Sequence, residues 1–343
     1  MEKVSATASR AEQASRKTLD GVEWLTWQSH RRTENIASYY GIPVTVITSK
    51  ARGLRRYLQA SLQTLRYLYR NRPRVLIVQN PSLVLTLLAV LLRPLLCYRL
   101  VVDAHNEAVQ PFIHTSAQMV SLSRWLLRKA DITIVTNQAL AGIVQSAGGV
   151  AVVLPDRLPD IRLSMAGEPL LAKKTRAVLI ATFARDEPIA EVLEAHAHVR
   201  EDVDLYVTGR LANLPVDIRE KYREFVGFTD FLPEGEYEKL LEEADFIVDL
   251  TLMDNCLVCG AYEAIALGKP AILSDNRATR DYFYKGVVYV DNTVDGLVNG
   301  MRNMLADRRR LTAQALSLKA ELTDAWSRSA DNVGCVLTRG LPG

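Results

Sequence analysis

Short apolar runs rich in Val, Ile and Leu alternate with longer amphipathic segments along most of the chain. The first half contains such runs at 22–27, 44–48, 75–78, 99–103, 131–136 and 150–154. The second half contains them at 178–181, 205–208, 225–228, 244–251, 271–274 and 287–290. Strands of this length separated by helices are typical of parallel sheets with right-handed crossovers. The pattern therefore predicts an α/β protein in which the alternation begins again in a second domain.

Helical periodicity and helix-end signals occupy the intervals between the predicted strands. Thr33 is predicted as the N-cap of the first helix, which ends at Gly41, and Asn137 starts another helix. Further helices are predicted at 54–69, 83–92, 189–200, 234–243 and 293–328. Pro155 and Pro159 restrict the backbone between the two halves. We therefore predict a flexible tail at 1–20, domains at 21–160 and 175–308, and a C-terminal helix and tail at 309–343.

Composition limits the class of protein. The chain has 343 residues, of which 48% are hydrophobic, enough to fill the cores of two domains. No segment approaches the roughly 20 apolar residues that a membrane-spanning helix needs. The first residues show no apolar stretch typical of a secretory signal, and four cysteines are too few for a disulfide framework. These features favour a cytoplasmic protein.

Positive charge is concentrated in the first half of the chain. Residues 35–102 contain ten Lys and Arg and no Asp or Glu. Because the whole chain has a net charge of +3, the remaining residues carry about −7. The predicted helix at 54–69 combines leucines and tyrosines with a basic set, which is Arg52, Arg55, Arg56, Arg66 and Arg70. We expect this region to face an anionic membrane surface, the alternative being a crossover helix with one solvated face.

The segment at 254–275, DNCLVCGAYEAIALGKPAILSD, carries the clearest chemical signal. Gly260 lies in a turn of small residues, Glu263 opens a short predicted helix, and Pro270 ends it. Small residues let the backbone approach a ligand, and a helix N-terminus offers amide donors to phosphate. A carboxylate one turn further on can accept paired sugar hydroxyls. The segment therefore suits a nucleotide sugar, and the alternative is an ordinary helix start in an α/β protein.

This segment resembles the donor-site motif of the GT-B glycosyltransferases, particularly the family 4-like group. The resemblance implies two Rossmann-like domains with parallel sheets facing across a cleft, and a C-terminal helix that crosses back to the first domain. Glu263 corresponds to the glutamate that holds the donor ribose, and Arg185 to the arginine that holds the pyrophosphate. The other donor-binding residues that we expect are Gly209, Phe228, Asp254, Asn255, Cys259 and Gly260.

Two features depart from the family pattern. Asn255 occupies the place of a second glutamate. Ile189 and Ala190 follow Pro188 where a lysine is expected, and Arg185 has the alternative of pairing with a neighbouring carboxylate. These departures leave open the donor sugar and the choice between a retaining and an inverting reaction.

Loops after strands of the first domain contain further candidates. Ligands bind at the carboxyl ends of parallel strands, so we expect His30, Arg31 and Arg32 near the acceptor side of the cleft, unless they form a solvated basic loop. Asp103 and His105 follow a later strand and are the catalytic candidates, unless they cap a turn. The resemblance implies a histidine here that touches the donor sugar or supports the loop. Asp103 is the better general base for an inverting enzyme.

The resemblance implies a metal-independent hexosyltransferase without a cofactor. Its donor is a nucleoside diphosphate sugar, with UDP favoured over GDP, and its acceptor is a lipid-linked saccharide in polysaccharide biosynthesis. Such an enzyme would be cytoplasmic and peripheral to the inner face of the plasma membrane, with no nucleic-acid partner and an oligomeric state that the sequence leaves open. The alternatives are a nucleotide-sugar epimerase of the same fold, and a catalytically silent subunit that binds nucleotide sugar or acts as a scaffold at the membrane.

Overall fold

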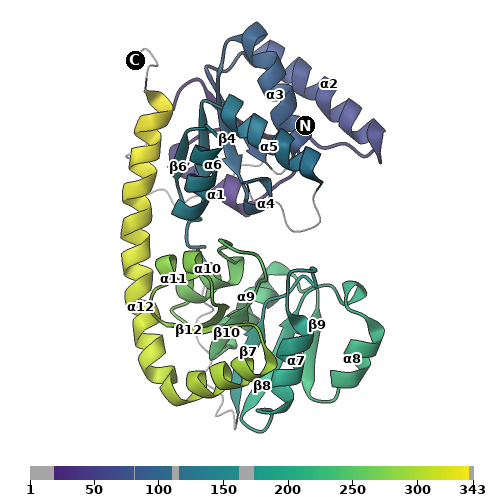
Figure 1. Ribbon diagram of the computed structural model, residues 1–343, viewed down its shortest axis with the longest axis vertical. Helices are drawn as coiled ribbons and strands as arrows, with labels where there is room; N and C mark the ends of the chain where they lie inside the picture. The colour runs from purple at the N-terminus through teal and green to yellow at the C-terminus, as the bar shows by residue number, and fades with distance from the viewer. Residues whose placement is uncertain (1–18, 81, 110–115, 162–173, 340–343) are drawn as a thin grey trace. The chain divides into compact units, whose positions relative to one another are not determined.

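The computed structural model describes residues 19–80, 82–109, 116–161 and 174–339, and it divides into two compact units (Figure 1). Unit 1 comprises Met1–Arg157 and Trp326–Gly343, and unit 2 comprises Leu158–Ala325. Most of the tail predicted at 1–20 lies outside the described residues. No helix within the described ranges is long and apolar enough to cross a membrane.

Unit 1 is built on a six-stranded sheet in the order β2-β1-β3-β4-β5-β6. Its strands are β1 (Val22–Thr26), β2 (Val44–Val46), β3 (Val75–Asn80), β4 (Arg99–Ala104), β5 (Ile132–Val135) and β6 (Ala151–Val153). Every neighbouring pair in this sheet is parallel. The central strands β3 and β5 are buried along their whole length because helices cover both faces of the sheet.

Helices cover the two faces of this sheet unequally. On one face, α2 (Leu54–Asn71), α3 (Leu83–Leu96), α5 (Ala117–Lys129) and α6 (Gln138–Ser146) contribute to a common core cluster. On the other face, α1 (Arg31–Tyr40) packs with the last turns of α12. The chain goes from β1 to β2 in one direction and then returns past β1 to β3. With right-handed crossovers, this reversal places α1 on the face opposite the later helices.

Unit 2 repeats the arrangement with a sheet in the order β12-β11-β10-β7-β8-β9. Its strands are β7 (Thr175–Leu179), β8 (Val203–Thr208), β9 (Val226–Asp230), β10 (Phe246–Asp249), β11 (Ala271–Ser274) and β12 (Val287–Val290). All pairs are again parallel, with a register shift between β8 and β9 at Val207 and Thr208. The sequence prediction of two parallel α/β domains is confirmed.

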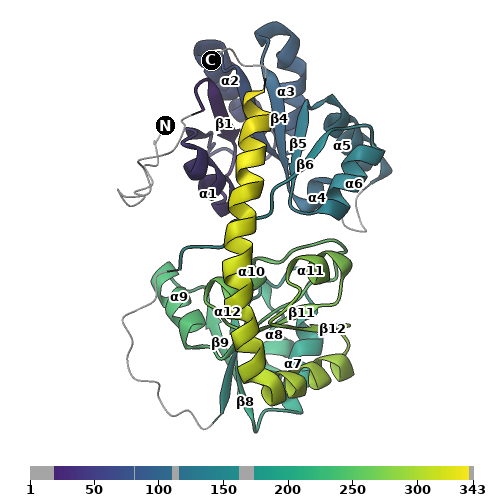
Figure 2. The same cartoon turned by 90° about the vertical axis from the view of Figure 1, so that its left-hand side faces the viewer.

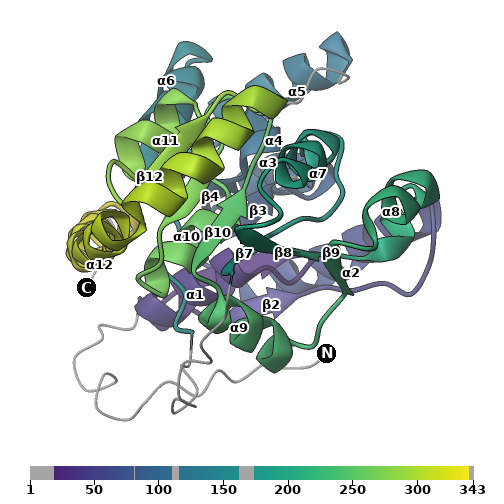
Figure 3. The same cartoon turned by 90° about the horizontal axis from the view of Figure 1, so that it is seen from below.

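The helices of unit 2 also form two layers. One layer contains α7 (Ile189–Ala197), α8 (Val216–Tyr222) and the start of α12 (Val294–Thr338). The other contains α9 (Glu234–Glu243), α10 (Cys259–Ala266), α11 (Arg277–Tyr282) and the middle of α12. Figure 3 shows α7 and α8 on one side of strands β7 to β9 and α9 on the other.

The last turns of α12 belong to unit 1. Trp326, Ala330, Val333 and Leu337 recur at helical spacing and are buried against the sheet of that unit. The Trp326 indole donates to the carbonyl of Pro155 at 2.9 Å. Figure 2 shows these turns in front of the strands of unit 1. The prediction that a C-terminal helix returns to the first domain is therefore confirmed.

Several predicted boundaries are wrong. His30, not Thr33, is the N-cap of α1, because its Nδ1 accepts from the backbone N–H of Arg32. Helix α10 begins at Cys259, so Glu263 lies in its second turn and not at its start. Helix α12 is continuous over 45 residues and runs past residue 328.

Candidate functional site

Each sheet reverses its strand order at one point, and such points form crevices at the carboxyl ends of the strands. In unit 1 the reversal lies at β1 and β3, where the chain continues into His30 and Asn80. In unit 2 it lies between β7 and β10, where the chain continues into 180–188 and 250–258. We call these two places the carboxyl edges of unit 1 and unit 2. The candidate residues are found at both.

A buried ion pair organises the carboxyl edge of unit 1. Arg32 Nε lies 3.0 Å from Asp103 Oδ1, and Arg32 Nη2 lies 2.9 Å from the same oxygen. The guanidinium also bonds to the Asp156 carboxylate and donates to the carbonyl of Leu154 at 2.9 Å. Burial acts to lower the pKa of Arg32, but the attraction of the two carboxylates outweighs it and raises the pKa. The arginine therefore ties α1 to β4 and to the segment after β6.

This pairing corrects two predictions. Asp103 is fully buried and Arg32 is 4% exposed, so neither side chain is open to a substrate. A general base must reach the proton that it removes, and the Asp103 carboxylate is instead enclosed with Arg32. Their role in this structure is structural. Arg31 is exposed, as expected for a residue at the edge.

His105 occupies the position expected of a site residue at the carboxyl edge of unit 1. Its Nε2 lies 2.9 Å from Gln79 Nε2, and its ring packs edge-on against His30 with centroids 4.5 Å apart. Gln79 is held in turn by the Thr26 hydroxyl, which donates to Gln79 Oε1 at 2.6 Å. Burial lowers the pKa of His105 to about 4 against the opposing charge of Asp103, and the charge of Arg32 adds to the lowering. The imidazole is therefore neutral at pH 7, which makes it a hydrogen-bonding group and not a strong base.

Sequence reasoning missed two polar residues at this edge. Gln79 positions the His105 ring, as described above. Asn80 is fully buried, and neither atom of its amide has a hydrogen-bond partner within the described part of the chain. The sequence does contain a sign that these two residues belong to a site. Gln79 and Asn80 are polar residues that end an otherwise apolar run, at the carboxyl end of a buried strand.

The first amides of α10 are partly occupied by the protein itself. The backbone N–H of Gly260 donates to Asp249 Oδ2 at 2.6 Å, and a Cβ at Gly260 would lie 2.6 Å from that oxygen. Glycine at this position therefore leaves room for the Asp249 carboxyl group. Burial raises the pKa of Asp249 well above its ordinary value, against the effect of the Gly260 bond, and the negative charge of Glu263 raises it further. The sequence analysis did not single out Asp249, because in the sequence it is only the polar residue that ends an apolar strand.

Glu263 is one helical turn beyond Gly260 and close to this carboxyl group. It is 8% exposed, and its Oε2 accepts a hydrogen bond of 2.6 Å from the hydroxyl of Tyr237 in α9. The hydrogen bond from Tyr237 therefore fixes the orientation of the Glu263 carboxylate in the absence of a ligand. The predicted ribose-binding carboxylate thus lies at the carboxyl edge of unit 2.

The loop after β7 folds around the carboxylate of Glu187. This carboxylate accepts bonds from the backbone N–H groups of Thr182, Phe183 and Ala184 at 2.9, 2.8 and 3.3 Å. Asp186 accepts from the Thr251 hydroxyl at 2.8 Å and links this loop to the one after β10. Arg185 is exposed and forms no ion pair with either acidic neighbour. The alternative of a local ion pair for Arg185 is therefore not found in the structure.

The remaining predicted donor residues lie nearby with different degrees of exposure. Gly209 has a φ of +107°, and a Cβ there would lie 2.2 Å from the carbonyl oxygen of Ala181. Phe228 is half-buried against the core, whereas Asp254 and Cys259 are exposed. Asn255 has a φ of +57°. Asparagine tolerates this conformation better than glutamate, which gives a local reason for its replacement of the family residue.

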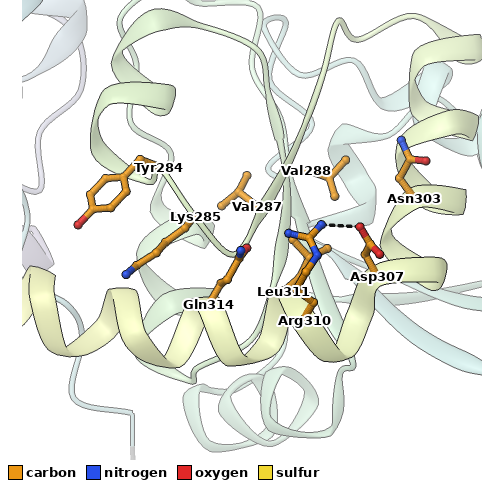
Figure 4. A pocket seen from close by; sticks show the side chains of 9 residues that line it. All are labelled: Tyr284, Lys285, Val287, Val288, Asn303, Asp307, Arg310, Leu311 and Gln314. Carbon is orange, nitrogen blue, oxygen red and sulfur yellow. Dashed lines mark hydrogen bonds and ion pairs between the residues drawn. The ribbon is translucent and has the colours of Figure 1, made fainter.

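A cavity of about 570 Å³ lies elsewhere in unit 2, between the start of β12 and α12 (Figure 4). Its charged groups are already paired, since Arg310 bonds to Asp307 and Lys285 to Glu321. It adjoins the amino end of β12, opposite the carboxyl edge. Within the described ranges, no three His, Cys, Asp or Glu side chains are grouped to hold a metal ion.

Comparison with known proteins gave matches by structure alone. No protein-family model matches the sequence, and no curated protein is similar to it. Sucrose-phosphate synthase from Thermosynechococcus elongatus superposes with a TM-score of 0.72 at 15% identity, covering 86% of this chain and 82% of the synthase. HepE from Anabaena, in complex with UDP and glucose, superposes with a TM-score of 0.72 at 14% identity, covering 92% and 91%.

The chain has the GT-B fold. A Listeria monocytogenes protein assigned as a UDP-N-acetylglucosamine 2-epimerase also superposes, with a TM-score of 0.62 at 13% identity, covering 92% of this chain and 95% of that one. At such identities these likenesses establish the architecture. The GT-B fold expected from the sequence is thereby confirmed.

The structural role of the Arg32–Asp103 pair can be tested by unfolding. Asp103→Ala leaves a buried guanidinium without its main partner, which is expected to lower the free energy of unfolding by about 3–5 kcal/mol. Urea denaturation measures this loss. Asp20→Ala is the matched control, because Asp20 is an exposed carboxylate of the same unit. An Asp103→Ala variant as stable as the wild type would contradict the structural role.

Proposed function

We propose that this chain is a glycosyltransferase that takes a sugar from a nucleoside diphosphate sugar and transfers it to an acceptor at a membrane. The observation that carries the proposal is that an oriented carboxylate, Glu263, and an exposed guanidinium, Arg185, both lie at the carboxyl edge of unit 2 in a GT-B fold. HepE, which shares this fold, is solved with UDP and glucose and with UDP-glucose. UDP is accordingly the favoured carrier.

In the proposed donor complex, Glu263 accepts the two ribose hydroxyls while Tyr237 holds the carboxylate in place. Arg185 binds the diphosphate, because a guanidinium matches phosphate oxygens in a bidentate manner. Its positive charge and nearby backbone amides stabilise the departing nucleoside diphosphate without a metal ion. His105, neutral and held by Gln79, is proposed to hydrogen-bond the acceptor at the carboxyl edge of unit 1.

Helix α2 supports the proposed membrane location. Five apolar side chains form an exposed stripe at spacings of three and four residues, and they are Leu54, Leu58, Leu62, Leu65 and Tyr69. Their exposed fractions range from 42% to 87%. The helix is anchored to unit 1 by a different face, which contains its buried residues Ala60, Thr64 and Leu68. The stripe therefore remains available to an outside partner.

Arginines complete this surface. Arg55, Arg56, Arg66 and Arg70 are exposed on α2, and Arg52 precedes it. The neighbouring helix α3 adds exposed Leu91 and Leu95. An exposed apolar stripe beside cations suits the headgroup boundary of an anionic bilayer. We propose that the enzyme binds the cytoplasmic leaflet through this surface as a peripheral protein. There it would bind its acceptor, a lipid-linked saccharide of polysaccharide synthesis.

A second candidate function is nucleotide-sugar epimerisation, which is favoured by the structural likeness to the Listeria protein. Radiolabelled UDP-sugar incubated with the protein and a lipid extract separates the candidates. Label in the lipid fraction supports the transferase, and interconverted free UDP-sugar supports the epimerase. Binding without either product supports a catalytically silent subunit.

The Glu263 assignment predicts a loss of nucleotide affinity without a loss of stability. Hydrogen bonds to a charged group are worth about 1.5–3 kcal/mol, so Glu263→Ala is expected to weaken UDP binding at least about tenfold. The melting temperature should not fall when the charge alone is removed in Glu263→Gln, because the glutamine oxygen can still accept from the Tyr237 hydroxyl. Isothermal titration calorimetry and thermal melts measure the two quantities.

Glu236→Gln is the matched control, because it removes an exposed carboxylate from the adjacent helix α9. Its UDP affinity should equal that of the wild type. Unchanged UDP affinity in Glu263→Ala would contradict the proposed donor site.

The stripe on α2 predicts lipid binding. Full burial of a leucine contributes about 1.5–3 kcal/mol, so replacing Leu58 and Leu62 with Gln is expected to lower binding to phosphatidylglycerol vesicles at least about tenfold. Flotation assays measure the bound fraction. Gln63→Ser, an exposed polar change on the same helix, serves as the control. Undiminished flotation of the double variant would rule out the stripe as the membrane contact.

A further inference from the structure

The loop after β7 contains an anion-binding site that the protein fills with its own side chain. Three consecutive backbone N–H groups, those of Thr182, Phe183 and Ala184, converge on the Glu187 carboxylate at 2.9, 2.8 and 3.3 Å. The Thr182 hydroxyl donates a fourth bond of 2.7 Å. Phe183 has a φ of +60°, which turns successive amides toward one point. Such concave groups of amides bind anions, including phosphates.

The position of this loop makes a phosphate a suitable competitor for Glu187. The loop follows β7 at the reversal of strand order in unit 2, where ligands of parallel sheets bind. Arg185 lies within the loop, is exposed and forms no ion pair in the described structure, so its cation is available to a second anion. A phosphate offers oxygen acceptors that can replace those of the carboxylate.

Glu187 is not needed to cap the following helix. Helix α7 begins at Ile189, and Pro188 at its N-cap makes no side-chain capping bond. The Glu187 side chain instead points back to the start of its own loop. The negative charges of Glu187, Asp186 and Glu263 all act on the buried Asp249 and raise its pKa. The negative charge of Glu187 therefore repels an incoming diphosphate unless the Glu187 side chain moves away from the amides.

We propose that Glu187 is an internal competitor for the diphosphate of the donor, which binds the amides at 182–184 by displacing this carboxylate. The inference rests on the proposed function for its biological ligand, but the site itself binds inorganic pyrophosphate by the same chemistry. Occupation of the amides by Glu187 lowers the fraction of molecules that are competent to bind. Removing the carboxylate therefore strengthens diphosphate binding.

The test compares pyrophosphate and UDP binding in matched variants. The apparent Kd equals the intrinsic Kd divided by the fraction of molecules whose amides are free, and Glu187 fills these amides most of the time. Glu187→Gln and Glu187→Ala are therefore expected to bind pyrophosphate at least about tenfold more tightly than the wild type. Glu191→Gln is the control, because it removes an exposed carboxylate from the first turn of α7. Its affinity should not change.

A second readout locates the binding. The amide resonances of Thr182, Phe183 and Ala184 are expected to shift with pyrophosphate in the ¹⁵N–¹H spectrum of each protein. Glu187→Gln keeps a neutral oxygen that accepts from these amides more weakly than a carboxylate does. It therefore preserves the loop if Glu187→Ala disturbs it, but yields to pyrophosphate more readily than the wild type.

Weaker or unchanged pyrophosphate binding in Glu187→Gln would overturn the proposal and make Glu187 a permanent part of the loop. Absence of pyrophosphate binding in every variant would also overturn it. Failure of UDP to bind, with the pyrophosphate effect intact, would count against the proposed function alone.

Discussion

Parallel pairing throughout both sheets is the constraint on which the rest of the structure depends. Because every strand in a sheet runs in the same direction, all carboxyl ends meet at one edge. The reversal of strand order at β1 and β3, and between β7 and β10, then sends consecutive helices to opposite faces and opens that edge to a ligand. Residues from different strands, such as Gln79 and His105, become neighbours in this way.

The two carboxyl edges satisfy their polar groups in different ways. In unit 1 a buried guanidinium neutralises Asp103, and a neutral histidine is left as the polar group near the surface. In unit 2 the carboxyl groups of Asp249 and Glu187 accept hydrogen bonds from backbone amides. The edge of unit 2 therefore holds internal hydrogen-bond acceptors before a ligand arrives, and Arg185 is one of its exposed cations. In the proposed binding mode, a diphosphate has to displace an internal acceptor from these amides.

Local pattern predicted the elements better than it predicted the site. The strands at 271–274 and 287–290 and the helix at 234–243 match the structure, because each is a compact apolar or amphipathic run between clear breakers. The start of α10 was missed since Val258 makes no side-chain cap, and the start of α1 since histidine is an unusual N-cap. The burial of Asp103 could not be read from sequence, because its partner Arg32 is distant along the chain and meets it only through the sheet. Glu263, by contrast, was predicted as a donor residue from its local setting after a small-residue turn and from the family resemblance, and its role stays a prediction.

Hydrogen–deuterium exchange in the presence of UDP tests most directly whether the carboxyl edge of unit 2 is the nucleotide site. The account predicts slower exchange in peptides that cover residues 180–188 and 256–266. It predicts no change in peptides that cover 284–288 and 303–314, which line the cavity beside α12. Protection confined to the cavity peptides, with none at the carboxyl edge, would contradict the account.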